Sequence, residues 1–433
     1  MFSAMFNLFR VKETRNKILF TLFVILLFRV GSFLPIPGVD ADVLKDQDNG
    51  LFGILNTFAG GALQQFSVFA MGIMPYITAS IVIQLMQMDV IPTLTEWSKQ
   101  GEVGQKKTQK LTKVLTMILA FIQSLVMSYG FNNAYVGLIK DTSVLGFVTV
   151  ALVLTAGTAL LLWLGDQITQ YGVGNGVSII ILAGIIARLP QEFIQVYESQ
   201  IKDAENLTLA LLKVGIVAFV VLAVVMSVVY VQEAIRKIPI QYSQARAGRR
   251  MLRARSTFLP LRVNSAGVIP VIFAIAFLQL PRTLTIFWPN NEKLNKVVSY
   301  FDFSHWAGLT LYVVLIIAFC YFYVMVQVNP EKMAENLKKQ GSFVPGIRPG
   351  KETEKYITGI LYRLTFVGSI FLAAIAVLPT IFTSLAKLPA SVQIGGTSLL
   401  IVVSVALETV KQLNTQLTER HYRSFLNSRK GGK

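Results

Sequence analysis

The chain has 433 residues, of which 53% are hydrophobic and only 15% are charged, and its formal net charge is +17. This composition excludes an ordinary soluble globular protein of that size, so lipid is the expected solvent for most of the chain. The single cysteine, Cys320, excludes an intrachain disulfide.

Apolar windows that could cross a bilayer occur along the whole chain. A helix needs about 20 apolar residues to cross about 30 Å of hydrocarbon. The first window is kept as a span because it has no small-residue cleavage site. The sequence predicts an all-α membrane protein with ten transmembrane helices, in the windows 18–34, 51–88, 114–131, 144–164, 167–187, 214–232, 263–280, 309–328, 364–386 and 388–407.

Lysine and arginine are distributed unequally between the two faces that these windows define. The face that carries both termini has 27 of them, and the opposite face has 6. Cytoplasmic loops carry an excess of positive charge, so the first face, with both termini, is predicted to be cytosolic.

Two basic connections on this face, 231–262 and 329–355, carry dense charge clusters. The guanidinium group of arginine matches phosphate and carboxylate groups. A docking surface for ribosomal RNA or for an acidic protein is therefore one interpretation, and a plain orientation signal is the other. The candidate docking residues are Arg249, Arg250, Arg255, Lys338, Lys339, Arg348 and Lys351.

The second window, 51–88, is too long for one straight crossing and is interrupted by Gly60-Gly61 and by the motif 72–75. We expect a short helical piece at about 51–66 that enters from the outer side without crossing, and a second piece from about 68 that completes the span. Non-helical backbone at this depth is tolerated where protein or a water-filled cavity surrounds it. The alternative is that glycine and proline only kink a packed helix.

A short repeat relates the two halves of the chain. The motif Gly-Ile-Met-Pro at 72–75 and the motif Gly-Val-Ile-Pro at 267–270 are each followed, nine residues after the proline, by Gln-Leu. Each motif lies at the second span of a set of five, and an odd number of spans forces the two sets into opposite orientations. The sequence thus predicts two inverted five-helix halves, with a pathway at their interface. The predicted divisions are an N-terminal half 1–187, an external hinge connection 188–211, a C-terminal half 212–412 and a cytosolic tail 413–433.

The predicted spans contain no pattern typical of a catalytic, metal-binding or nucleotide-binding site. Both histidines, His305 and His421, fall outside the predicted spans, and Glu408 can pair with Lys411 at a span end. We find no metal-ligand spacing, no catalytic set and no nucleotide loop, since the glycine-rich run 172–176 is interpreted as the flexible start of a membrane helix. The sequence predicts neither an enzyme nor a cofactor. An apolar interior favours a passive channel over an ion-coupled transporter, which needs buried ionisable groups.

Several motifs together resemble the SecY family, the central subunits of the protein-conducting channel of the bacterial plasma membrane. The resemblance covers the whole chain. It is carried by Phe-Leu-Pro-Ile-Pro-Gly at 33–38, Gly-Ile-Met-Pro-Tyr-Ile at 72–77, the run 172–176, Ser-Thr at 256–257, Leu-Pro-Leu at 259–261, Phe-Val-Pro-Gly-Ile-Arg-Pro-Gly at 343–350 and Gly-Gly-Thr-Ser-Leu-Leu-Ile at 395–401.

The resemblance implies an hourglass pore that passes unfolded secretory polypeptides and releases hydrophobic segments sideways into lipid through a lateral gate. A short plug helix, 51–66, would close it from outside, with the residues Leu51, Phe52, Ile54, Leu55, Phe58, Gly60, Gly61 and Phe66. A ring of branched side chains would form the constriction: Ile73, Ile77, Val177, Ile181, Ile272 and Ile401. The i, i+4 spacing of two pairs in this ring independently places each pair on one helix face.

The implied gate lies between the second and third spans on one side and the seventh and eighth on the other, with Gln84 and Asn264 as polar contacts across it. The implied partners are the small membrane subunits SecE and SecG, the SecA motor, the ribosome, signal-bearing preproteins and the lipid bilayer. Arg348 is the docking residue that we weight most, and energy would come from the partners. Two alternatives stay open: an inverted-repeat secondary transporter of small solutes, and a scaffold that gathers ribosomes at the membrane.

Overall fold

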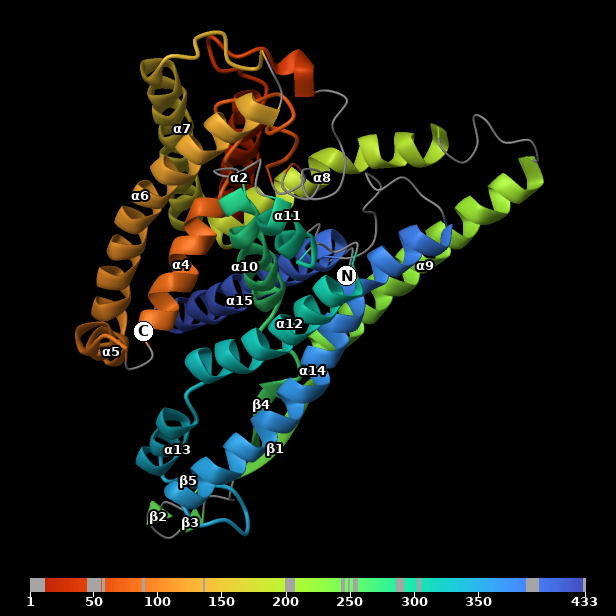
Figure 1. Cartoon of the computed structure of the whole chain (residues 1–433). Helices are drawn as coiled ribbons and strands as arrows, with labels where there is room; N and C mark the ends of the chain where they lie inside the picture. The colour runs from red at the N-terminus through yellow and green to blue at the C-terminus, as the bar shows by residue number, and fades with distance from the viewer. Residues whose placement is uncertain are drawn as a thin grey trace.

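Each of the ten predicted spans overlaps a helix (Figure 1). The structure is a computed structural model, and it describes residues 12–44, 56, 59–87, 90–134, 137–198, 207–242, 246–247, 250–251, 256–285, 292–301, 305–386 and 397–430. The helices are α2 (Lys12–Gly31), α4 (Met74–Met86), α6 (Glu102–Ala134), α7 (Val144–Tyr171), α8 (Gly176–Tyr197), α9 (Leu207–Glu233), α10 (Ile269–Thr285), α12 (Trp306–Gln327), α14 (Lys351–Ala386) and α15 (Thr397–Lys430). Shorter elements are the 3₁₀ turn η1 (Ala41–Leu44) and the helices α5 (Pro92–Lys99), α11 (Glu292–Ser299) and α13 (Pro330–Lys339).

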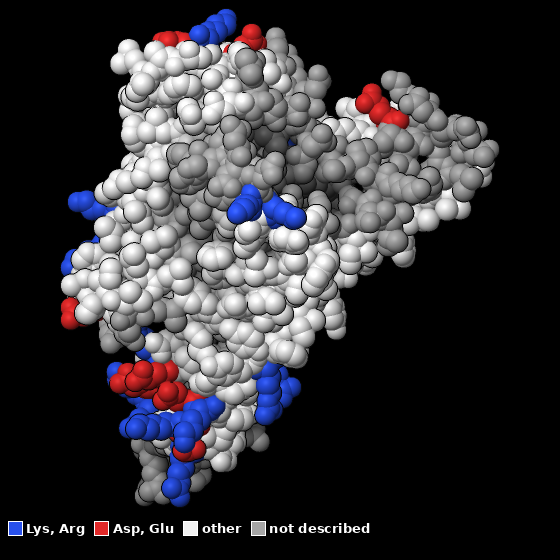
Figure 2. Space-filling view, viewed as in Figure 1, with Lys and Arg blue, Asp and Glu red and all other residues white. Residues whose placement is uncertain are grey.

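Six of these helices are long and apolar enough to cross a membrane by themselves, and α4 and α10 contain shorter apolar stretches. Large apolar side chains point outward along them, most clearly on α9, where Phe219 and Tyr230 are 73% and 79% exposed. Such surfaces are unfavourable in water and suit lipid. The space-filling view shows a broad uncharged zone, with charges mainly toward the ends of the molecule and a small basic group over α11 (Figure 2). The chain is therefore a multi-pass, predominantly α-helical membrane protein, as predicted.

The two halves of the chain pack against each other mainly at two places. Within the first half, α4 packs on α6, α6 on α7, and α7 on α2 and α8. Within the second half, α10 packs on α12, α12 on α14, and α9 on α15. Between the halves, α4 contacts α10 and α8 contacts α15. The first pair joins the second spans of the two halves and the other joins their fifth spans, so each seam is formed by corresponding helices of the predicted repeat.

Several element boundaries differ from those expected. Helix α4 begins at Met74 rather than near residue 68, because Gly72 has φ +54° and Pro75 fixes the first helical turn. The predicted helix at 51–66 is described only in part, and residues 59–66 form turns. Helix α8 continues to Tyr197, well into the predicted hinge connection, since a charged residue ends an apolar window without ending a helix.

A small β-sheet was not predicted. Strand β1 (Ile235–Tyr242) pairs antiparallel with β4 (Ser256–Arg262) and, at its end, with β5 (Ser342–Phe343), in the order β4-β1-β5. The pairing of Gln241 with Phe343 joins the two basic connections that the sequence left separate. A second pair, β2 (Arg246–Ala247) and β3 (Arg250–Met251), extends beyond it. An apolar cluster that includes Ile238, Ile240, Leu261, Leu337, Val344, Ile357 and Leu361 lies beneath the sheet.

Candidate functional site

The six side chains of the proposed ring come from the four helices that form the two seams. Ile73 and Ile77 lie at the start of α4, and Ile272 lies near the start of α10. Val177 and Ile181 belong to α8, and Ile401 belongs to α15. Five of the six are buried, Val177 is partly buried, and all pack in one hydrophobic cluster. The structure thus places residues from positions 73 to 401 in one apolar cluster, on the helices that join the two halves.

The two glycine-proline motifs adopt the same local structure. Gly72 and Gly267 have φ +54° and +65°, and the helix begins two residues later in both. The carbonyl of Ile73 accepts a hydrogen bond from Ile77 N at 3.1 Å, and the carbonyl of Val268 accepts one from Ile272 N at 3.4 Å. The left-handed backbone explains why glycine stands at both positions. The sequence repeat therefore corresponds to a structural one.

The run 172–176 is a hydrogen-bonded turn rather than a flexible segment. Asn175 caps α8, because its side-chain oxygen accepts hydrogen bonds from Val177 N at 3.1 Å and Ser178 N at 3.4 Å. Gly176 N donates to Thr169 Oγ1 at 2.8 Å, and Val173 N donates to Thr21 Oγ1 at 3.0 Å. Thr21 and Thr169 hold this turn, and the sequence did not predict their contacts. The sequence gives little indication of these contacts, because the hydroxyl of a threonine in an apolar helix usually donates to a carbonyl of the same helix.

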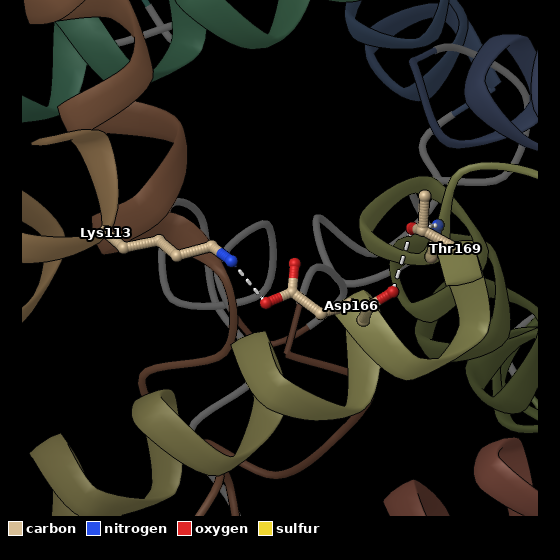
Figure 3. Close-up of polar contacts among 5 residues, drawn as sticks. Lys113, Asp166 and Thr169 are labelled. Atoms are coloured by element: carbon tan, nitrogen blue, oxygen red, sulfur yellow. Dashed lines mark hydrogen bonds and ion pairs between the residues drawn. The ribbon is translucent and has the colours of Figure 1, made fainter. Parts of the chain in front are cut away.

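Asp166 and Lys113 form an ion pair between α7 and α6, near the turn that positions α8 (Figure 3). Thr169 lies one turn beyond Asp166, and its hydroxyl donates to the carbonyl of Gly165 at 2.9 Å. Gly176 lets the start of α8 approach α7 closely, since a Cβ on Gly176 would lie 1.8 Å from Gly165 O. The polar contacts and the close packing together fix the start of α8, and hence Val177.

The described part of the re-entrant segment, residues 59–73, is buried among helices of the first half. A Cβ on Gly157 of α7 would lie 1.9 Å from the carbonyl oxygen of Val68, and one on Gly31 of α2 would lie 2.1 Å from the ring of Phe69. Non-helical backbone thus occurs deep in the protein, where neighbouring elements satisfy it.

Main-chain pairing holds the same segment to the chain that follows α2. Val68 N donates to Leu34 O at 3.0 Å, and Ile36 N donates to Phe66 O at 3.4 Å. The motif 33–38 therefore pairs through its main chain with residues 66–68 of the re-entrant segment.

The proposed plug residues are only partly described. Gly60 and Gly61 form a left-handed turn with φ +67° and +86°, and the side chain of Phe66 is fully buried. Asn56 is fully buried as well, and its side-chain oxygen accepts a hydrogen bond from Gln64 N at 3.1 Å. Five further predicted residues lie outside the described part of the chain: Leu51, Phe52, Ile54, Leu55 and Phe58.

The two proposed gate residues make local hydrogen bonds. Gln84 Nε2 donates to Ser80 Oγ of the same helix at 3.1 Å, and Asn264 Nδ2 donates to the carbonyl of Gly267 at 3.1 Å. The polar contact across the seam stays a prediction. Among the described residues, Gln84 Oε1 is buried and has no hydrogen-bond partner.

Two charged side chains correct the expectation of an interior without ionisable groups. Arg188 and Glu192, one turn apart on α8, are each only 3% exposed. The sequence placed both in an external connection because the apolar window ended at residue 187. The predicted pair of Glu408 with Lys411 is replaced by an ion pair of 2.8 Å between Lys411 and Glu233, which joins α15 to α9.

The described docking residues lie on the body built around the β-sheet. Lys338, Lys339, Arg348 and Lys351 are exposed, and Lys339 forms an ion pair of 3.4 Å with Glu335. Figure 2 shows acidic and basic groups mixed at this end of the molecule, so the surface is less uniformly basic than the sequence predicts. Arg250 lies in β3, and Arg249 and Arg255 fall outside the described residues. Among the described residues, no group of histidine, cysteine, aspartate or glutamate could hold a metal ion.

Comparison with known proteins identifies close relatives. The family model of SecY matches residues 67–410. A protein translocase subunit SecY of Bacillus licheniformis is 58% identical over 429 residues, which cover 98% of this chain and all of the relative. Among solved structures, a protein-conducting channel has a TM-score of 0.63 with 18% identity, covering 93% of this chain and 92% of the channel. Sec61 in a canine ribosome–channel complex from the endoplasmic reticulum has a TM-score of 0.60 with 17% identity, covering 93% of this chain and 92% of Sec61.

Proposed function

This chain belongs to the SecY family, and from that premise we propose that it forms a channel through which unfolded polypeptides cross the plasma membrane. The observation that supports the proposal is that the six predicted ring residues share one apolar cluster and come from the four helices that join the two halves. A ring of aliphatic side chains excludes ions by dewetting when no polypeptide fills it, and it selects little beyond an extended chain. The protein is a channel subunit rather than an enzyme.

We further propose that the six ring residues form the constriction and that the segment 51–66 closes it from the outer side. The buried turn 59–61, with the buried side chain of Phe66, supports this placement. A lateral gate fits the seam between α4 and α10, with α6 and α12 packed behind these two helices. Polar contacts between membrane helices are worth only about 1 kcal/mol, so such a seam can part when a signal sequence enters.

The partners that we propose are SecE and SecG in the membrane, with SecA and the ribosome at the cytosolic face. The solved Sec61 relative is a ribosome–channel complex. The exposed basic residues of the sheet body, on the face that the positive-inside rule places in the cytosol, support docking there. Both termini share that face in this proposal, and ATP or GTP hydrolysis resides in the partners.

The test is reconstitution of the chain with the small subunits and the motor into lipid vesicles. We expect a signal-bearing polypeptide to become protected from protease when ATP is present, and the same polypeptide without its signal to stay accessible. No protection, together with uptake of a small solute, would favour the transporter and contradict the channel. Ribosome binding without protection would favour the scaffold.

A further inference from the structure

Arg29 lies in the last turn of α2, and its side chain contacts the re-entrant segment. Its guanidinium Nη1 donates a hydrogen bond of 2.6 Å to the carbonyl of Gly60, and its Cζ lies 4.7 Å from the centre of the Phe33 ring. An arginine near the end of an apolar helix ordinarily turns its charged group toward water. Here the charged group is directed to one main-chain oxygen of the re-entrant segment.

The turn at Gly60 can present this oxygen in only a narrow range of positions. Gly60 and Gly61 are both left-handed, and a Cβ on Gly60 would lie 2.9 Å from Cα of Gly184 on α8. The neighbours Ala59 and Ala62 are buried. A buried carbonyl that loses its donor is costly, and a hydrogen bond from a charged donor is stronger than one from a neutral donor.

The other described attachments of the segment lie farther along the chain. Main-chain pairing holds Phe66 and Val68, and the rings of Phe28 and Phe69 stack with 6.0 Å between their centres. These contacts anchor residues 66–69. Within the segment, the turn 59–61 is closed by Gly61 N, which donates to the carbonyl of Asn56 at 2.9 Å. The described hydrogen bond that this turn receives from outside the segment comes from Arg29. From this turn the chain runs without helix to Ile73, which is the N-cap of α4 and a ring residue.

We infer that Arg29 is a positioning residue that holds the turn 59–61 against α8 and thereby keeps the resting channel sealed to ions. The inference rests on the proposed channel function. Without the Arg29 bond, the docked turn loses its charged donor, and the segment that leads to Ile73 is free to shift. The equilibrium between docked and released turn should change by roughly 10- to 100-fold when one hydrogen bond from a charged donor is lost.

The test is ion conductance of the reconstituted complex in planar bilayers, for Arg29→Ala, Arg29→Gln and Arg29→Lys. We expect the resting conductance of the alanine variant to rise by about tenfold or more. It should rise less in the lysine variant, which keeps a charged donor but loses the planar guanidinium group that lies over the Phe33 ring. Arg15→Ala is the matched control, since Arg15 is an exposed arginine of the same helix. It should leave the conductance unchanged.

A second variant separates this role from general destabilisation. Gly60→Ala disturbs the same turn while Arg29 is kept, so it should also leak, and the double variant with Arg29→Ala should leak no more than the stronger single variant. Gly359→Ala, which meets no atom within 4 Å, should behave as wild type.

Two results would overturn the inference: an Arg29→Ala conductance equal to that of Arg15→Ala, or a leak that is fully additive in the double variant. Either result leaves the channel proposal intact if wild-type complex still protects a signal-bearing polypeptide. Loss of that protection in the wild type would instead contradict the proposed function.

Discussion

Ile77 and Ile272 occupy equivalent positions in two copies of one local structure. Each lies five residues after a left-handed glycine, and each donates its backbone N–H to the residue four positions earlier, at 3.1 and 3.4 Å. Both side chains are buried in the same apolar cluster. The two halves therefore contribute to the candidate ring through the same helical turn.

Replacement of Ile77 or Ile272 by glycine or by a charged residue should increase ion leak through the resting complex, because the ring loses an apolar side chain that keeps it dry. Conductance in planar bilayers measures this. Ile316→Gly, at a fully buried position of α12 in the same cluster, is the control for lost packing. Equal leak in the control and ring variants would remove Ile77 and Ile272 from the pore.

Gly157→Ala should destabilise the protein by about 1–3 kcal/mol or more, because overpacking forces the main chain apart. The added carbon would lie 1.9 Å from the carbonyl oxygen of Val68. The thermal unfolding midpoint in detergent measures the effect. Gly215→Ala on α9, where no atom lies within 4 Å, should be neutral or slightly stabilising. Similar midpoints for both variants would contradict the close contact.

Asn175→Ala should lower the free energy of unfolding by about 1 kcal/mol, the usual cost of an N-cap. Asn175→Ser or Asn175→Asp should restore most of it, since both residues can accept the bonds from Val177 N and Ser178 N. Because the cap positions Val177, the alanine variant should also show a small ion leak. A full loss of stability that serine does not rescue would point to a different role.

The ion pair between Lys113 and Asp166 should contribute only about 0.2–1 kcal/mol, because both side chains are nearly half exposed. A double-mutant cycle with Lys113→Ala and Asp166→Ala measures the coupling, and added salt should reduce it. A coupling that is large and independent of salt would show that the pair acts in a more buried state of the protein.

Neutralising Lys338, Arg348 and Lys351 together should weaken binding of the ribosome or motor and flatten its dependence on salt, since exposed cations attract an anionic partner over the Debye length. Titration of the reconstituted complex at two salt concentrations measures both effects. The matched control neutralises Lys293 and Lys296 on α11, which lie on the face predicted to be external. If the triple variant binds as tightly as the double control variant, the basic surface serves only as an orientation signal.

The membrane class, the ten helices and the repeat could be predicted from the amino-acid sequence. Each of these depends on local information: runs of apolar residues satisfy the lipid core, and a glycine before a proline sets the start of a helix in both α4 and α10. The cytosolic orientation of the basic connections is also local in origin and stays a prediction.

Contacts between residues that are distant in the sequence are seen only in the folded structure. The sheet joins two basic connections because Gln241 pairs with Phe343, and no local pattern specifies a partner 102 residues away. Arg29 donates to the carbonyl of Gly60, which the left-handed turn 60–61 presents, and no local pattern specifies this partner 31 residues away. The burial of Arg188 was not predicted for the same reason. A charged residue ends an apolar window in the sequence, but packing and hydrogen bonding determine where the helix ends and which side chains it buries.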